Sequence, residues 1–437
     1  MTLTYEKREP RIGSFRRCFV IPFLRFTVVC SVLFVTGNAF ADELNLRELL
    51  DEALKNSPEI LASQYRASAS EYRIPQAKSL PDPMFMFGYQ NEGWNKYSFG
   101  DTQMSWWMFS ASQMIPFPGK LALKAEMASK ESESLRASYD SSRIKIVARV
   151  KELYFDLFLA YKNVDLIKER TALFSKMEDA AVARYSSGMG QHQEVLMAQT
   201  EKYMLLEKEE MQKQRIQSIE AMLNAAVGRD TGSPLGRPAE PSVNASTRGI
   251  EELLSMGYEN SPEIRSRQKM VAAAETKVRM AEKEYYPDFT LTGSVMKRAG
   301  DFEDMWSLTT AINIPIFYRT KQRQAVNEAK ASLAEARSEL EAVKLMLSSA
   351  MRDNFSMMKS AERLMEIYKD GLIPKTYQDF ESALAGYVSG KVEAIAVISR
   401  LKALLEFETL YWGQFVEREK AVARLEGFAG IMEAGGK

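Results

Sequence analysis

Cysteine and histidine are almost absent from this sequence, which removes several classes of chemistry. Its two cysteines, Cys18 and Cys30, fall within the first 41 residues, and His192 is its one histidine in 437 residues. Beyond residue 41 the chain has one histidine and no cysteine, and these cannot supply the four ligands of a structural zinc site. No nucleophile–base pair, phosphate-binding loop or metal-ligand helix motif is found either. We therefore expect no enzyme, no cofactor and no dedicated metal centre.

Residues 1–41 have the pattern of a secretory signal peptide. Arginines come first, an apolar stretch runs from Phe26 to Val35, and Ala39-Phe40-Ala41 is a typical cleavage site. The alternative is an N-terminal membrane anchor, but a spanning helix needs about 20 apolar residues. Cys30 follows Val29 rather than a small residue, which makes it a poor lipid-attachment site. The mature chain is thus expected to contain no cysteine and no disulfide.

Positive and negative charges balance in this sequence, with 58 lysines and arginines against 58 aspartates and glutamates. Removal of the signal peptide leaves 52 basic against 56 acidic residues, with no basic stripe, so we expect no nucleic-acid partner. No later apolar run is long enough for a spanning helix. A secreted chain of this kind is either soluble in the periplasm or part of an outer-membrane barrel.

The chain consists of two tandem copies of one unit, each about 200 residues long. The pentad Asn56-Ser-Pro-Glu-Ile60 recurs as Asn260-Ser-Pro-Glu-Ile264. Each copy continues through a Pro-Asp pair, two strand-like segments and a very long helix. We place the domain boundaries as follows: signal peptide 1–41; first repeat 42–228, with a strand hairpin at 83–117 and a helical hairpin at 119–228; linker 229–248; second repeat 249–437, with a strand hairpin at 288–316 and a helical hairpin at 318–430.

Each repeat contains two segments with strand periodicity. Apolar and small polar residues alternate over 84–90, 103–115, 289–295 and 306–314. Lengths of about 7 to 12 residues suit tilted membrane-spanning strands. A half-buried soluble hairpin would show the same alternation. Four strands are too few to close a barrel, so a membrane location requires several chains.

Long coiled-coil helices are the second structural signal. Apolar residues recur every seven positions, as at Val150, Leu157 and Val164. No proline lies between Gly119 and Tyr185, so a single helix there would extend roughly 100 Å. In the second copy, the segment 371–374 ends in a proline, and we expect the helix to break or kink there.

These features, in this order and duplicated, resemble the TolC family of outer-membrane channel proteins. The resemblance covers essentially the whole mature chain and implies a mainly α fold with a small β-barrel part. Three identical chains would contribute four strands each to a twelve-stranded barrel, and their long helical hairpins would form an α-barrel through the periplasm. The location implied is the outer membrane of a Gram-negative bacterium.

The resemblance also implies partners. A periplasmic adaptor protein would meet the hairpin tips, an inner-membrane pump of the RND or ABC type would supply energy, and outer-membrane lipid would surround the barrel. The function implied is passive conduction of drugs or heavy-metal ions in a tripartite efflux system. A type I secretion exit duct and a soluble periplasmic coiled-coil scaffold remain alternatives.

Residues near the tips are candidates for a gate at the periplasmic entrance. Tyr387 matches a gating tyrosine of the family, although it can equally be an aromatic of the coiled-coil seam. A link between Glu194 and Lys391 is a hypothesis for holding the gate closed, and Glu393 is a candidate replacement for a missing acidic ring. The family's acidic positions are occupied by Ala396 and Ser399 here.

The adaptor-contacting tips are predicted at two glycine-containing turns. His192, just past the first turn, is expected on the surface. The tip residues are Ser187, Gly188, Met189, Gly190, Ser389 and Gly390.

Methionine is abundant, with 24 in the sequence, and several crowd the first strand hairpin. Thioethers are soft ligands suited to Cu(I) or Ag(I). Methionine is also an adaptable apolar filler, so both interpretations stay open. The first-hairpin methionines are Met84, Met86, Met104, Met108 and Met114.

Overall fold

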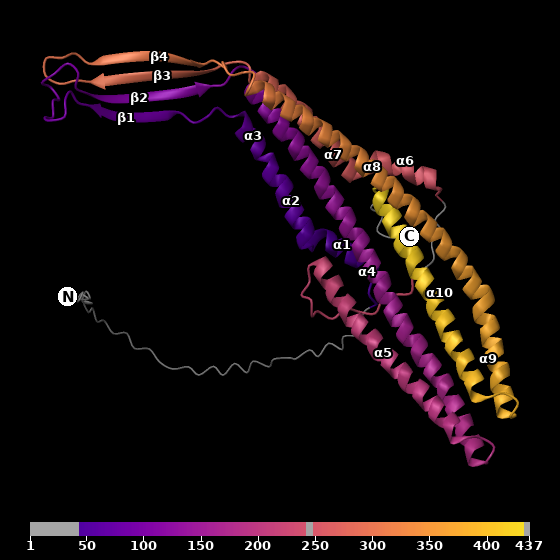
Figure 1. Cartoon of the computed structure of the whole chain (residues 1–437). Coiled ribbons are helices and arrows are strands. Elements are labelled where there is room, and N and C mark those ends of the chain that lie inside the picture. Colours follow the sequence, from indigo (N-terminus) through magenta and orange to yellow (C-terminus); the bar gives the residue numbers. More distant parts are fainter. Residues whose placement is uncertain (1–42, 242–247, 432–437) are drawn as a thin grey trace, which may run out of the picture. The chain divides into compact units, whose positions relative to one another are not determined.

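A computed structural model describes residues 43–241 and 248–431, which are mainly helical with one small sheet. Figure 1 shows the four strands side by side and the long helices packed lengthwise. The predicted signal peptide lies outside the described residues. The elements in chain order are α1 Leu46–Asn56, α2 Pro58–Glu71, α3 Arg73–Lys78, β1 Met84–Gln90, β2 Trp106–Ile115, α4 Lys120–Ser186, α5 His192–Val227, α6 Ile250–Asn260, α7 Pro262–Lys283, β3 Asp288–Lys297, β4 Met305–Asn313, α8 Gln322–Glu366, a π-helical segment Ile367–Leu372, α9 Ile373–Val388 and α10 Ala394–Phe428.

Helix α4 is the central element of the helical part. It is one uninterrupted helix of 67 residues and packs against α2, α5, α7 and α10. Val150 and Leu157 of the predicted seam are fully buried, and Val164 is 7% exposed. The seven-residue spacing therefore predicted which face of α4 packs inward.

The repeated pentad separates two helices in the same way in both copies. Ser57 and Ser261 stand between helices, and each following proline opens the next helix at its first position. The carbonyl oxygen of Asn56 lies 2.4 Å from where a Cβ on Gly228 would be, and Asn260 lies 2.9 Å from the same point on Gly430. Each pentad thus receives the C-terminal end of its own repeat's last helix.

One antiparallel sheet contains all four strands in the order β1-β2-β3-β4. The expected strand over 103–115 begins at Trp106, because residues 91–105 form a loop. In that loop the Asn91 side chain accepts a hydrogen bond of 2.8 Å from the Ser98 amide and donates one of 2.8 Å to the Lys96 carbonyl. The two strand hairpins pair with each other through β2 and β3, although 172 residues of chain separate those strands.

The strand register gives the sheet two chemically different faces, because directly paired residues point to the same side. One face is apolar and aromatic: it includes Phe87 paired with Phe109, which in turn pairs with Val295, and Val295 with Trp306. The next row on the opposite face contains Ser110, Ser294 and Ser307. This alternation is the pattern of a strand with one side toward lipid.

A buried lysine fixes the junction of helices and sheet. Lys120, whose side chain is 4% exposed, lies 2.9 Å from the Asp288 carboxylate and 3.3 Å from that of Glu284. Asp288 also accepts the Phe117 amide at 2.8 Å. The repeated Pro-Asp pair of the second copy therefore connects the start of α4 to the start of β3.

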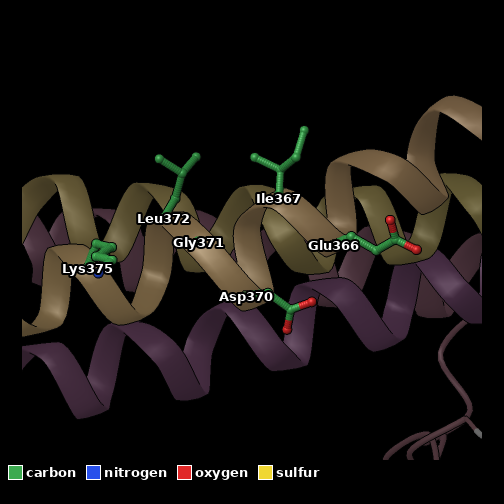
Figure 2. A pocket seen from close by; sticks show the side chains of 6 residues that line it. All are labelled: Glu366, Ile367, Asp370, Gly371, Leu372 and Lys375. Atoms are coloured by element: carbon green, nitrogen blue, oxygen red, sulfur yellow. The ribbon is translucent and has the colours of Figure 1, made fainter.

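The helix containing Pro374 does not break. The backbone stays helical from α8 through the π-helical segment into α9. The Ile373 amide donates a hydrogen bond to the Tyr368 carbonyl, five residues back. In a π-helical turn, each amide pairs with the carbonyl five residues back instead of four. This change in hydrogen bonding comes just before Pro374, which has no amide hydrogen, and the chain stays helical. Six residues line a pocket over this segment, and Figure 2 shows Ile367 and Leu372 pointing out on the same side: Glu366, Ile367, Asp370, Gly371, Leu372 and Lys375.

The described part of the predicted linker is attached to the first repeat. Pro238 forms a parallel bridge with Leu44, and Arg229 pairs with Glu52. Residues 242–247 lie outside the described residues. Across the described ranges, no helix is both long and apolar enough to cross a membrane.

Candidate functional site at the hairpin tips

The two hairpin tips share one backbone geometry. Gly188 and Gly390 have φ angles of +73° and +74°, a conformation that glycine adopts without a Cβ penalty. The Met189 amide donates to the Arg184 carbonyl at 2.9 Å, and the Lys391 amide donates to the Gly386 carbonyl at 2.8 Å. The bonds run from the residue after the left-handed glycine to a carbonyl five residues back, as in a Schellman motif. The turns are therefore equivalent, and differences between the tips arise from side chains.

Tyr387 is fully buried at the junction of the two tips. Its hydroxyl donates a hydrogen bond of 2.9 Å to the Glu194 carboxylate, in the first turn of α5. Burial and the neighbouring Glu194 carboxylate raise the pKa of Tyr387 to about 12. The tyrosine is therefore a neutral donor throughout the physiological range, and it connects the second hairpin to the first.

Arg184 is the residue that sequence reasoning missed. Its guanidinium lies over the Tyr387 ring, 4.7 Å from the centroid, and donates to the Tyr387 carbonyl. It also donates to the Met189 carbonyl at 3.0 Å. One side chain thus contacts both turns and places a cation against an aromatic face. We call Arg184, Tyr387 and Glu194 the tip clamp.

The sequence carried a weak signal for Arg184. A basic residue in the last turn of a helix is favoured by the helix dipole, and Arg184 occupies that place in α4. Its contact with Tyr387 joins residues 203 apart in the chain. No periodicity in the sequence reports a contact at that separation.

The predicted Glu194–Lys391 ion pair is not formed within the described chain. Glu194 turns toward the Tyr387 hydroxyl instead, while the Lys391 side chain is exposed. Glu393 is also exposed and precedes the first residue of α10 without capping it. The structure brings Tyr387 and Glu194 together and leaves Lys391 and Glu393 in solvent.

The predicted tip residues are exposed, apart from partly buried Gly190, and Met189 is 69% exposed. A Cβ on Gly190 would lie 3.0 Å from the Arg184 Cβ and 3.1 Å from the Glu194 Oε2. Because Gly190 has no side chain, it leaves space for the Arg184 and Glu194 side chains of the tip clamp. His192 is on the surface, as predicted, with its ring 5.2 Å from that of Tyr185. Ser187, Gly188, Ser389 and Gly390 complete the set.

A family model described as outer membrane efflux protein matches residues 49–229 and 253–399. The chain belongs to the outer membrane efflux protein family. The matched segments include both pentads and both tips. The predicted family and fold class are confirmed, and this efflux protein is a channel component located in the outer membrane.

Two relatives and one solved structure show what the efflux protein is similar to. The cobalt-zinc-cadmium resistance protein CzcC of Cupriavidus metallidurans is 22% identical over 395 residues, covering 89% of this chain and 91% of the relative. The cation efflux system protein CusC of Escherichia coli is 22% identical over 313 residues, covering 67% of this chain and 65% of the relative. The Campylobacter jejuni CmeC outer membrane channel superposes with a TM-score of 0.78 at 16% identity, covering 91% and 88% of the two chains. At that identity, the structural likeness shows the fold.

Proposed function

We propose that this efflux protein is the outer-membrane exit duct of a tripartite efflux system and acts as a homotrimer. The observation that carries the proposal is the four-stranded sheet. Among the described residues, no further strand pairs with its edge strands β1 and β4, and its exposed face is aromatic and aliphatic. Free edges cannot face lipid, so the strands require other strands on both sides. Three chains supply twelve strands, which close a barrel.

The helices extend the duct into the periplasm. Helix α4 alone has 67 residues, which corresponds to about 100 Å. The exposed tips at Ser187–Gly190 and Ser389–Gly390 dock a periplasmic adaptor, and an inner-membrane pump of the RND or ABC type supplies the energy. The duct itself conducts passively.

Heavy-metal cations are the proposed cargo. The support is that two relatives are named for resistance to cobalt, zinc and cadmium and for cation efflux. Deletion of the gene in the native bacterium should raise the cellular content of the exported metal under metal stress, measured by elemental analysis for cobalt, zinc, cadmium, copper and silver. Unchanged metal content together with loss of a secreted protein would instead identify a type I secretion duct.

The tip clamp is the proposed lock of the periplasmic entrance. Arg184 and Tyr387 join the two hairpins of one chain, and Glu194 accepts the tyrosine hydroxyl. Lys391 and Glu393 are exposed beside the clamp, where they would line the entrance. Opening the entrance requires the hairpins to separate, which breaks the clamp.

Conductance of the purified trimer in a planar bilayer tests the duct and its lock together. Tyr387→Phe removes one hydrogen bond to a carboxylate, worth about 1.5–3 kcal/mol, and should raise the open probability. Tyr203→Phe, at a side chain 73% exposed, is the matched control and should conduct as the wild type does. A water-soluble monomer that never inserts would overturn the duct, and equal conductance of all three proteins would overturn the lock.

A further inference from the structure

Three methionines occupy one row across three neighbouring strands. Met108 of β2 pairs directly with Met296 of β3, and Met296 pairs directly with Met305 of β4. Directly paired residues lie with Cβ atoms about 4.5–5.5 Å apart on the same side of a sheet. A methionine side chain has three rotatable bonds before its methyl group, so neighbouring sulfur atoms in such a row can converge.

The β1 position of this row is a glycine. Gly88 pairs with Met108, and the Met108 Cε lies 3.8 Å from where a Cβ on Gly88 would be. A Cβ at that position would meet the methionine only at an ordinary van der Waals distance, so the Met108 methyl group lies over the backbone of β1 at Gly88.

The methionine row lies on the polar face of the sheet. The adjacent row on that face is Met86, Ser110, Ser294 and Ser307, so hydroxyls and one more thioether come next. The opposite face is lined by aromatic and branched side chains. In an outer-membrane barrel the apolar face meets lipid and the polar face meets the water-filled lumen. The thioethers are therefore lumenal in the proposed barrel.

Burial along β3 agrees with this orientation. Residues on the methionine face, including Thr292, Ser294 and Met296, are half-buried, whereas Leu291 and Val295 on the other face are exposed. Side chains are more crowded on the concave side of a curved sheet, and the concave side of a barrel wall is its inside. Within the row, Met108 and Met296 are half-buried and Met305 is 42% exposed, so the row is open to solvent.

We propose that Met108, Met296 and Met305 form a binding site for a soft monovalent cation, Cu(I) or Ag(I), in the lumen of the barrel. Thioether sulfur prefers such ions over harder cations. The inference deepens the proposed export of metal cations and depends on it for the orientation of the sheet. Neutral ligands alone hold a cation weakly, and weak sites favour passage because the ion can leave again.

The test is binding of Ag⁺ to the full-length mature protein as the detergent-solubilised trimer, followed through the methyl signals of isotope-labelled methionines. Addition of Ag⁺ should shift the signals of Met108, Met296 and Met305, whereas Na⁺ at the same concentration should shift none. A triple variant Met108→Leu, Met296→Leu and Met305→Leu keeps side-chain volume and should lose the saturable Ag⁺ uptake measured by equilibrium dialysis.

A second triple variant provides the matched control. Met204, Met211 and Met346 are exposed on helices outside the sheet, and their replacement by leucine should leave the sheet signals and the uptake unchanged. Equal Ag⁺ uptake by wild type and the sheet variant would overturn the site. So would shifts that appear equally in helix and sheet methionines.

Failure of this site and failure of the proposed function are distinguishable. A wild-type trimer that conducts and lowers cellular metal, yet shows no Ag⁺-dependent shift, would overturn the methionine site and leave the duct standing. A trimer that binds Ag⁺ at the row but never conducts in a bilayer, even as the Tyr387→Phe variant, would support the site and overturn the duct.

Discussion

At the scale of single residues, the tip clamp combines a buried hydroxyl, a carboxylate and a guanidinium. Tyr387 has no exposed surface, so its hydroxyl must find a partner within the protein, and Glu194 supplies it. Arg184 reaches over the ring to the backbone of both turns. The geometry of the tip clamp is thus a consequence of the burial of Tyr387.

The raised pKa of Tyr387 predicts an alkaline dependence of stability. The pKa rises from an ordinary 10.0 to about 12 because the side chain is buried and faces Glu194. Below pH 10 both folded and unfolded chains keep the proton, so the contribution of the hydroxyl is complete. Between pH 10 and about 12 the unfolded chain loses its proton first, and the contribution declines.

Thermal unfolding at pH 8 to 12 measures this effect. The difference in unfolding midpoint between wild type and Tyr387→Phe should be constant up to about pH 10 and shrink above it, since phenylalanine has no proton to lose. Tyr203→Phe should follow the wild type at each pH. A difference that stayed constant to pH 12 would contradict the assigned cause.

Replacement of Arg184 by lysine should loosen both tips. Lysine keeps the charge but lacks the planar fork that reaches two carbonyls and the ring at once. Loss of one hydrogen bond costs about 1 kcal/mol. Hydrogen exchange of the tip amides in residues 187–193 and 389–395 should therefore accelerate roughly fivefold. The control is Lys391→Gln, at an exposed side chain of the second turn, and it should leave the exchange of these amides unchanged.

At the scale of elements, the pentads and the terminal glycines of each repeat form matched contacts. Gly228 has a φ of +84° and closes α5, with its Cα facing the Asn56 carbonyl. Gly430 repeats the arrangement against Asn260. The motifs found at opposite ends of each repeat in the sequence thus meet in space.

Gly228→Ala should destabilise the first repeat strongly. A residue other than glycine in this left-handed conformation costs about 1–2 kcal/mol, and the new Cβ would also lie 2.4 Å from a backbone oxygen. Gly93→Ala is the control, because Gly93 has a similar φ of +85° but nothing within 4 Å. Unfolding midpoints should fall further for Gly228→Ala; equal losses would show that only the φ angle matters.

At the scale of the whole molecule, the open sheet has an apolar face that one chain leaves exposed. Trp306 and Leu308 are 79% and 66% exposed, and both lie on that face. Exposed apolar surface of this extent on a strand indicates a surface that other molecules or lipid cover. The proposed trimer in the outer membrane provides both coverings.

Neighbouring substitutions on β4 distinguish its two faces. Leu308→Arg should impair insertion, since an arginine facing the bilayer midplane costs about 2–4 kcal/mol per chain. Thr309→Arg places the same charge on the polar face and should leave insertion intact while changing the cation selectivity of the channel. Trimer yield from outer-membrane fractions and reversal potentials measure these outcomes. Equal loss of insertion in both variants would contradict the assignment of the faces.

Sequence alone determined the elements and their family. Periodicity predicted the long helix over 119–185, alternation predicted the four strands, and the duplicated motifs indicated the TolC-type fold, because each signal is local or repeated. A break or a kink was expected at Pro374; the helix does not break, because the π-helical segment Ile367–Leu372 keeps it continuous. Whether the helix continues depends on backbone hydrogen bonds several residues before Pro374, and the presence of a proline alone does not predict them.

Tertiary structure decided which residues meet. Glu194 was predicted to face Lys391 and instead accepts a hydrogen bond from Tyr387, while Arg184 was not singled out at all. The methionine row likewise follows from a strand register that pairs Met108 with Met296, two residues 188 positions apart in the chain. Contacts of this kind depend on how distant elements align, and a shift of one residue would reverse the face of every strand side chain.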